Sequence, residues 1–246
     1  MSDGLYVSLV AVAVAALWGA VAGALLPRAA YRFSVPSGEE WRTACPAGHG
    51  VSGWLGGARC GRCAGPPYGP GAASVVVTAL VCAVLAAATG TRPELAVWLL
   101  LAPVGVLLAV VDFRVQRLPD PLTLPFAAAA LLLLGLTALL PEHAGEWTTA
   151  LLGSLALGAG YYLLYRINPG GMGFGDVKLA LGAGAVLGWY GWPTVMLGTL
   201  AGFVSGALYG GALVVARKAG RRTAIPFGPF LISGAFVGLL MGAYAA

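Results

Sequence analysis

Eight long apolar runs constrain the fold of this chain more than any other feature. Most approach the roughly 20 residues that an α-helix needs to cross a bilayer core, and irregular backbone cannot face lipid. The chain is 59% hydrophobic and only 9% charged, which excludes an ordinary soluble domain. We therefore predict an all-α polytopic membrane protein with about eight transmembrane helices. The runs cover residues 5–27, 73–90, 95–112, 122–140, 147–165, 177–192, 193–215 and 225–245, with the least distinct boundary at Gly191-Trp192-Pro193.

The basic residues lie on alternate connections between these runs. Of the 14 Lys and Arg residues, only Arg92 falls on the other set of connections. Such a bias marks cytoplasmic loops, so we expect both termini to lie outside. This placement accounts for the net charge of +5, and we expect no nucleic-acid partner. The first run has no basic segment before it, which favours a retained helix over a cleaved signal peptide. The cytoplasmic residues are Arg28, Arg32, Arg42, Arg59, Arg62, Arg114, Arg117, Arg166, Lys178, Arg217, Lys218, Arg221 and Arg222.

The one long polar segment, residues 28–72, carries three of the four cysteines. Cys60-Gly-Arg-Cys63 is half of a zinc-ribbon pattern, and Cys45 with His49 could supply the other half. Disulfides are not expected on the cytoplasmic side, so the alternatives are a structural zinc site or plain thiols. Cys82 lies within an apolar run and is expected to be a packed thiol.

Most of the nine acidic residues are expected to be solvated. They are Asp3, Glu94, Glu142 and Glu146 on outer segments, and Glu39 and Glu40 on the cytoplasmic loop. His143, beside Glu142, is expected to be solvated as well. Asp120 precedes Pro121 and a new apolar run, so we interpret it as a helix N-cap. Asp112 and Asp176 remain.

Asp112 and Asp176 border apolar runs on the same predicted face. Asp112 follows the apolar residues 104–111 at the negative pole of a helix, where a carboxylate is disfavoured. A carboxylate in this position could form an ion pair with a nearby arginine, but we favour a functional role. Asp176 could cap the next helix. A cap does not need glycine at alternate positions, however, and we expect the glycines to take conformations closed to other residues and to hold an extended peptide. The expected substrate-loop residues are Gly171, Gly173, Gly175 and Lys178, the last of which could also pair with a carboxylate or anchor the helix.

At these residues the chain resembles the type IV prepilin leader peptidases, a family of Gly-x-Gly-Asp intramembrane aspartyl proteases. The resemblance covers most of the chain. It is carried by Asp112-Phe-Arg-Val-Gln-Arg-Leu-Pro-Asp120-Pro-Leu-Thr, Gly171-Met-Gly-Phe-Gly-Asp-Val-Lys-Leu179, Ile225-Pro-Phe-Gly-Pro-Phe230 and Trp54-Leu-Gly-Gly-Ala-Arg-Cys-Gly-Arg-Cys63.

The resemblance implies an aspartic endopeptidase that removes the short basic leader from type IV prepilins or pseudopilins, in pilus assembly and protein secretion. Asp112 and Asp176 would be the catalytic pair, at the cytoplasmic face of a bacterial inner membrane. Helix polarity favours Asp176 as the base and Asp112 as the proton carrier, and no metal is needed. Residues 1–72 would form a first helix with a degenerate methyltransferase-like loop, and residues 73–246 a seven-helix peptidase domain.

Larger family members also methylate the new pilin terminus with S-adenosylmethionine, and this chain departs from their pattern. Gly19-Ala-Val-Ala-Gly23 lacks the family's Ser and Asn, one cysteine pair is broken, and acidic residues are missing around Tyr68-Gly-Pro70. Methylation therefore stays an open alternative. A proton-coupled transporter would also use intramembrane carboxylates. A membrane scaffold that binds partners through its cysteine loop would leave the glycine alternation unexplained. Besides prepilin and lipid, no partner or oligomeric state is indicated.

Overall fold

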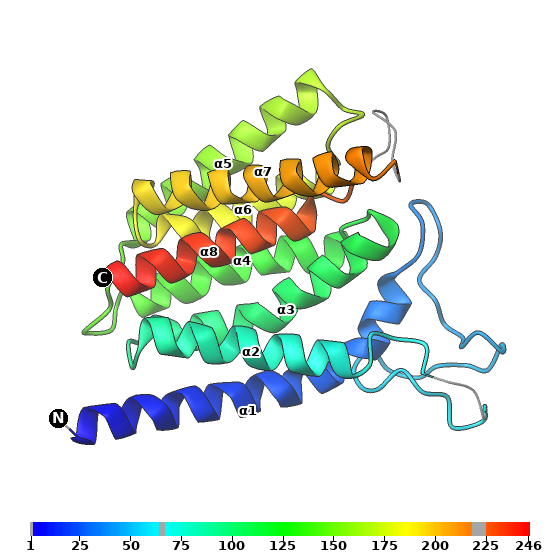
Figure 1. The fold of residues 1–246 in the computed structure, drawn as a ribbon, viewed down its shortest axis with the longest axis horizontal. Helices are drawn as coiled ribbons and strands as arrows, with labels where there is room; N and C mark the ends of the chain where they lie inside the picture. The colour runs from blue at the N-terminus through cyan, green and yellow to red at the C-terminus, as the bar shows by residue number, and fades with distance from the viewer. Residues whose placement is uncertain (1, 64–66, 218–224) are drawn as a thin grey trace. The chain divides into compact units, whose positions relative to one another are not determined.

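The computed structural model describes residues 2–63, 67–217 and 225–246, and these residues form eight α-helices joined by turns and one folded loop (Figure 1). The predicted all-α class is confirmed. Lys218, Arg221 and Arg222 lie outside the described residues, as does the side chain of Asp3. The helices are α1 (Ser2–Phe33), α2 (Ala72–Thr89), α3 (Glu94–Val115), α4 (Asp120–Thr137), α5 (Trp147–Ile167), α6 (Phe174–Gly188), α7 (Trp192–Val215) and α8 (Gly228–Ala245).

Among the described residues, seven helices are long and apolar enough to cross a membrane, and α6 is the exception. With 15 residues at 1.5 Å each, α6 is about 22 Å long, which is shorter than a bilayer core of about 30 Å. The predicted break between the sixth and seventh runs is present. Gly191 there has φ of 95°, a left-handed conformation that favours glycine.

The described residues form two compact units. Unit 1 comprises Met1–Thr91 and Leu95–Arg117, and unit 2 comprises Arg92–Glu94 and Leu118–Ala246. These geometric units do not test the functional division at residue 72, which stays a prediction.

In unit 1, α1 and α2 pack closely because small residues face each other. A Cβ atom added to Gly19 would lie 2.5 Å from the Thr78 carbonyl oxygen, and one added to Gly23 would lie 2.6 Å from that of Ser74. The Ser74 hydroxyl donates to the Gly23 carbonyl at 3.0 Å. Small residues allow this approach in membrane helices. The stretch from Gly19 to Gly23 therefore has a packing role.

The loop after α1 is folded onto a kink in that helix. Pro27 lacks an N–H group and interrupts the helical hydrogen bonds, and α1 changes direction near its end (Figure 1). Gly56 supplies the missing partners: its N–H donates to the Leu25 carbonyl at 2.8 Å, and its carbonyl accepts from the Arg28 N–H at 3.0 Å. Gly56 has φ of 119°, so a glycine is required here.

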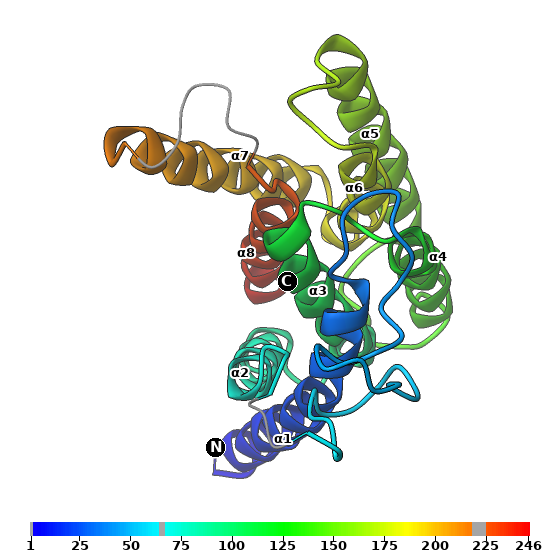
Figure 2. The ribbon, with the colours of Figure 1, turned by 90° about the vertical axis from the view of Figure 1, so that its right-hand side faces the viewer.

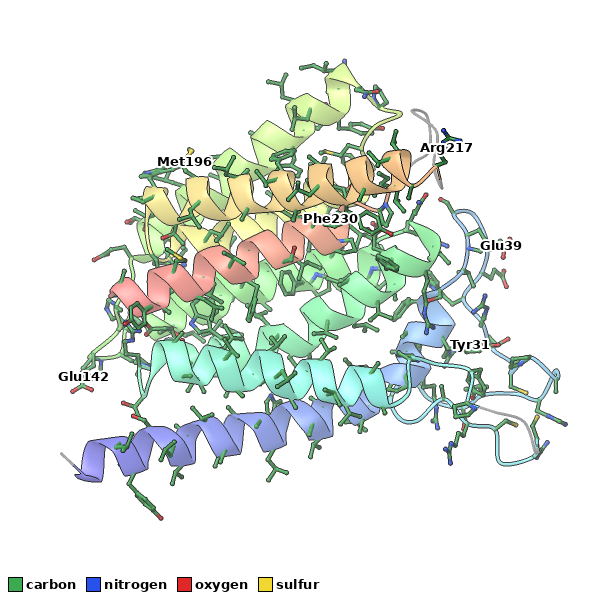
Figure 3. The ribbon with its side chains drawn as sticks, viewed as in Figure 1. Tyr31, Glu39, Glu142, Met196, Arg217 and Phe230 are labelled. Atoms are coloured by element: carbon green, nitrogen blue, oxygen red, sulfur yellow. The ribbon has the colours of Figure 1, made fainter. Side chains whose placement is uncertain are left out.

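Arginine side chains hold the rest of this loop in unit 1. Arg32 lies over the Trp54 ring at 3.8 Å and donates to the Arg42 carbonyl. Arg42 lies over the Tyr31 ring at 4.7 Å, close to the end of α1 (Figure 3). Arg117, which follows α3, lies over Trp41 and donates to loop carbonyls. These cations therefore stabilise the folded loop.

In unit 2, α6 is the central helix, with α4, α5, α7 and α8 packed around it (Figure 2). Nearly every residue of α6 after its first turn is buried. Glycine again allows close contact, because a Cβ atom on Gly153 of α5 would lie 2.6 Å from the Gly184 carbonyl oxygen of α6. The short α6 is therefore fixed along its whole length by longer neighbours, which gives its first turn a defined position.

Candidate active site

Asp176 is buried in the first turn of α6, with 6% of its surface exposed. Gly173 is the N-cap residue, so Asp176 is the third helical residue. Its Oδ2 accepts the Gly173 N–H at 3.0 Å, and its own N–H donates to the Gly173 carbonyl at 3.1 Å. This is the carboxylate half of a capping box. The carboxylate therefore stabilises its own helix end, where the backbone N–H groups also favour negative charge.

The glycines of the turn before Asp176 have a different backbone conformation from the one predicted. Gly171, Gly173 and Gly175 are not among the glycines with positive φ, so the expectation of a backbone closed to other residues is wrong. At two of these positions a glycine is needed instead because a larger side chain would collide with a neighbouring residue. A Cβ atom on Gly175 would lie 2.8 Å from Leu118 Cβ, and one on Gly171 would overlap the Asn168 side-chain amide. Gly171 and Gly173 are exposed, whereas Gly175 lies within α6.

Lys178 is paired with Asp120. Its Nζ donates to Asp120 Oδ1 at 2.6 Å, and it lies 5.0 Å from the Phe174 ring centroid. The prediction that Asp120 caps α4 is wrong: Pro119 is the N-cap residue, Asp120 is the first helical residue, and no side chain caps this helix. A proline before the helix pre-sets the backbone, and the Asp120 carboxylate is left to bind Lys178.

Asp112 lies in the last turn of α3 and is 4% exposed. Its carbonyl accepts the Gln116 N–H at 2.8 Å, which closes the helix end. Arg117, one of the suggested ion partners, is directed to the loop carbonyls of Pro36 and Glu39. Asp112 belongs to unit 1 and Asp176 to unit 2, so their pairing stays a prediction.

The structure gathers the four predicted metal ligands, Cys45, His49, Cys60 and Cys63, at one point of the loop. Their ligand atoms all lie within 4.8 Å of one another. Cys45 Sγ is 3.7 Å from both His49 Nδ1 and Cys63 Sγ, and Cys60 Sγ is 3.9 Å from His49 Nδ1. Zinc bonds of about 2.3 Å to sulfur and about 2.0 Å to nitrogen give tetrahedron edges of about 3.5–3.8 Å. The donor set therefore fits zinc, and these three separations lie close to such edges, whereas His49 Nδ1 and Cys63 Sγ are closer, at 3.1 Å.

The thiols of Cys45 and Cys63 have very different pKa values. For Cys45, desolvation raises the pKa, but hydrogen bonds from the His49 and Ala47 backbone and from neighbouring side chains bring it down to about 6. For Cys63, a hydrogen bond with Cys60, desolvation and nearby thiolate charge raise the pKa to about 12. One thiol of the cluster is thus set to be a thiolate, which is the form that binds metal. Cys82 is buried against Ala15 and Ala86, as predicted.

Residues 95–211 match the model of the Type IV leader peptidase family, and this segment contains both Asp112 and Asp176. That segment belongs to the type IV leader peptidase family. The curated relatives are named prepilin leader peptidase/N-methyltransferase. The Aeromonas salmonicida protein is 36% identical over 154 residues, covering 58% of this chain and 48% of its own. The Aeromonas hydrophila protein is 34% identical over 199 residues, covering 77% and 64%. The Escherichia coli K12 protein is 35% identical over 142 residues, covering 54% and 57%.

The chain spans about half the length of the first curated leader peptidases that it matches. No solved structure matches the chain significantly. The alternative of a proton-coupled transporter receives no support from these leader peptidase relatives. The matched segment includes the turn that carries Asp176 and the segment that carries Asp112 and Asp120, whereas the motifs at 54–63 and 225–230 lie outside it.

The expectations that Glu94 and His143 are solvated are wrong. Glu94 is fully buried, and its Oε1 lies 3.7 Å from Arg92 Nε and 3.3 Å from the Tyr190 hydroxyl. His143 is half-buried, with its Nδ1 2.9 Å from the Gly145 carbonyl oxygen and its ring 5.7 Å from Trp189. The sequence offered a signal for the Arg92–Glu94 contact: Arg92 is the only basic residue on its set of connections, and it lies two residues before Glu94.

Tyr161 of α5 is a buried residue that the sequence analysis did not single out. It is 1% exposed and lies in the apolar run beside Tyr162 and Tyr165, so periodicity alone does not distinguish the three. Its ring contacts Phe203 of α7 and Phe227, which precedes α8. Phe227 belongs to the Ile225–Phe230 motif of the leader peptidase resemblance, which gives that motif a packing partner.

Proposed function

We propose that this chain is an intramembrane aspartyl endopeptidase that removes the basic leader from a type IV prepilin or pseudopilin. The single observation that carries the proposal is the buried Asp176 carboxylate, held at the start of α6 behind an exposed glycine turn. A buried carboxylate at the border of an apolar helix is costly and so points to function. The family segment contains Asp112 as the one other buried aspartate.

Asp112 and Asp176 are proposed to act as a catalytic pair. Leu118, whose Cβ touches Gly175 of α6, follows Asp112 by six residues. Six residues span at most about 20 Å even when fully extended, so the chain itself limits how far the two aspartates can separate. This link supports a pair, because a peptidase of this type needs two carboxylates at one peptide bond.

Asp176 is proposed to act as the base. Its position at a helix N-terminus and the N–H group of Gly173 favour the charged carboxylate, which takes a proton from water. The water oxygen bonds to the carbonyl carbon of the substrate. Asp112, at a helix C-terminus, is proposed to hold the proton and to pass it to the leaving amine as the C–N bond breaks. The pair exchanges protons during turnover, so the roles belong to the dyad.

The glycine turn is proposed to receive the substrate. Gly171 and Gly173 are exposed and have no side chains, so an extended peptide can approach their backbone next to Asp176. We place this site at the cytoplasmic face of a bacterial inner membrane, where the chain's basic connections are expected. The substrate would then present its leader in the cytoplasm and its apolar helix in the lipid.

The cysteine cluster is proposed to hold a structural zinc ion. Cys45, His49, Cys60 and Cys63 would be its four ligands, and a closed set of this kind supplies folding energy and no catalysis. Methylation with S-adenosylmethionine, which the relatives' printed name includes, is not favoured for this chain. Its Gly19–Gly23 stretch is occupied by the contact with α2.

The test is a cleavage assay in detergent with prepilins from the same genome. Wild type should shorten a prepilin, and Asp112→Asn and Asp176→Asn should each lower the rate by at least about 1000-fold while remaining folded. Asp120→Asn is the comparison variant: it breaks the ion pair with Lys178 but keeps both proposed catalytic carboxylates, so it should lower the rate only several-fold. Cleavage by either dyad variant would remove that residue from the pair. No cleavage by wild type across several prepilins would overturn the proposed function.

A further inference from the structure

The packing of α5 against α6 places Tyr161 opposite Asp176. Gly153 of α5 lies against Gly184 of α6. The two helices run in opposite directions, so moving eight residues forward from Gly153 to Tyr161 corresponds to moving eight residues back from Gly184 to Asp176. Gly188 confirms this register, because it lies against Thr149, which is four residues before Gly153 just as Gly188 is four residues after Gly184.

Both residues also lie on the facing stripes of their helices. Residues four apart share one face of a helix. On α5 the stripe is Gly153, Leu157 and Tyr161, and on α6 it is Asp176, Ala180, Gly184 and Gly188; all seven are buried.

The Tyr161 ring is fixed by two aromatic side chains. Its centroid lies 5.8 Å from that of Phe203 and 5.9 Å from that of Phe227, and these two rings are 5.2 Å apart. The ring therefore has little freedom to carry its hydroxyl elsewhere. Such a fixed position is what a hydrogen-bond donor in an active site needs.

The Tyr161 hydroxyl is buried and has no hydrogen-bond partner among the residues that the structure describes. Buried hydroxyl groups in proteins almost always have a partner, and leaving one without a partner is costly. A group brought to Asp176 from outside the chain would supply it. In a peptidase, that group is the water or the peptide undergoing reaction.

We propose that the Tyr161 hydroxyl donates a hydrogen bond to the reacting oxygen at Asp176. This inference rests on the proposed peptidase function. The oxygen is first that of the attacking water, whose proton passes to Asp176 as its oxygen bonds to the carbonyl carbon. It then becomes a hydroxyl oxygen of the tetrahedral intermediate, and the C–N bond breaks as Asp112 protonates the amine. Tyr161 keeps its own proton throughout.

Tyr161→Phe tests this role, because it removes only the hydroxyl and keeps the ring between Phe203 and Phe227. We expect kcat for prepilin cleavage to fall about 10- to 100-fold, with KM changed less than about twofold. Tyr162→Phe is the matched control, since Tyr162 is the next residue on α5 and is 47% exposed; its kcat should equal that of wild type. Wild-type kcat in a folded Tyr161→Phe protein would overturn the proposal.

A second measurement applies if Tyr161→Phe does not fold. Replacing Tyr161 by 2,3,5-trifluorotyrosine keeps both the ring and the hydroxyl but makes the hydroxyl more acidic, and an ionised phenolate cannot donate. The alkaline limb of the kcat–pH profile should then move to lower pH, and an unmoved limb would overturn the proposal. Wild-type protein that fails to cleave any prepilin would instead refute the peptidase function itself, so the two failures are distinguishable.

Discussion

Lys178 Nζ lies 2.6 Å from Asp120 Oδ1, which joins the fifth residue of α6 to the first residue of α4. Gly175 meets Leu118 next to this ion pair, so two contacts fix the start of α6 on the segment before and within α4. Residues two apart on a helix do not face each other, so Lys178 binds Asp120 from a different side of α6 than the one that carries Asp176. The Lys178–Asp120 ion pair therefore helps to fix the start of α6, which contains the proposed base Asp176.

Breaking this ion pair should reduce cleavage more than it reduces stability. Asp120 is 60% exposed, so Lys178→Met should cost only about 0.2–1 kcal/mol of stability. A displaced Asp176 should nevertheless lower kcat several-fold. The charge-swapped double variant, Asp120→Lys with Lys178→Asp, should recover most of the loss shown by each single change. Cleavage kinetics and thermal unfolding of all four proteins would check this, and a double variant no better than the singles would contradict it.

The α5–α6 contact should not tolerate a single added methyl group at Gly153. A Cβ atom there would lie 2.6 Å from the Gly184 carbonyl oxygen, a backbone atom that cannot move alone. Gly153→Ala should therefore destabilise the protein by about 1–3 kcal/mol, measured as a lower Tm in detergent. Gly160→Ala is the matched control on the same helix, since no atom lies within 4 Å of its added Cβ atom. Equal Tm values for the two variants would show that the helices are less closely packed.

The all-α fold was predictable because the bilayer imposes its length and polarity on each apolar run. The break at Gly191 was predictable for a local reason, since glycine and proline interrupt helices. The ends of α6 were not predictable: the helix begins at Phe174, before the apolar run of residues 177–192, and it ends at Gly188 although that run continues through Trp189 and Tyr190. Hydropathy does not reveal where a buried helix ends.

The candidate site was predictable only where the residue type and the short-range spacing in the sequence indicate the chemistry. Asp112, Asp176 and four candidate metal ligands were predicted from residue type and spacing; the structure brings the four candidate ligands together, and the aspartate pair stays a prediction. Tyr161 was not identified, because its role depends on which residue of α6 it faces, and that follows from the Gly153–Gly184 register. The assignment of Asp120 as a cap failed for the same reason: its partner, Lys178, is 58 residues away in the chain.

Removing one ligand of the cysteine cluster should abolish stoichiometric zinc binding. Cys60→Ser replaces a thiolate by a weak ligand, so purified protein should fall from about one zinc ion per chain to well below that, measured by elemental analysis. The loop should also become more sensitive to protease. Cys82→Ser is the matched control, because Cys82 is buried on α2 outside the cluster. Wild-type protein purified without zinc that still resists protease would contradict a structural metal.

Glu94 should be essential for stability. Its carboxylate is fully buried, and Oε1 accepts from the Ala144 N–H at 3.4 Å and from the Tyr190 hydroxyl at 3.3 Å, with Arg92 Nε 3.7 Å away. It thus links the connections before α3, α5 and α7.

Glu94→Gln would leave the Arg92 cation without its counter-charge. Because the Arg92 side chain is 20% exposed, the loss should lie near the lower end of the range for buried pairs, about 3 kcal/mol. Glu142→Gln, an exposed acid on the connection before α5 (Figure 3), should leave Tm unchanged. Thermal unfolding in detergent would distinguish the two, while cleavage well below Tm should continue in both because the dyad is intact. A Glu94→Gln protein as stable as wild type would mean that the buried carboxylate is already neutral.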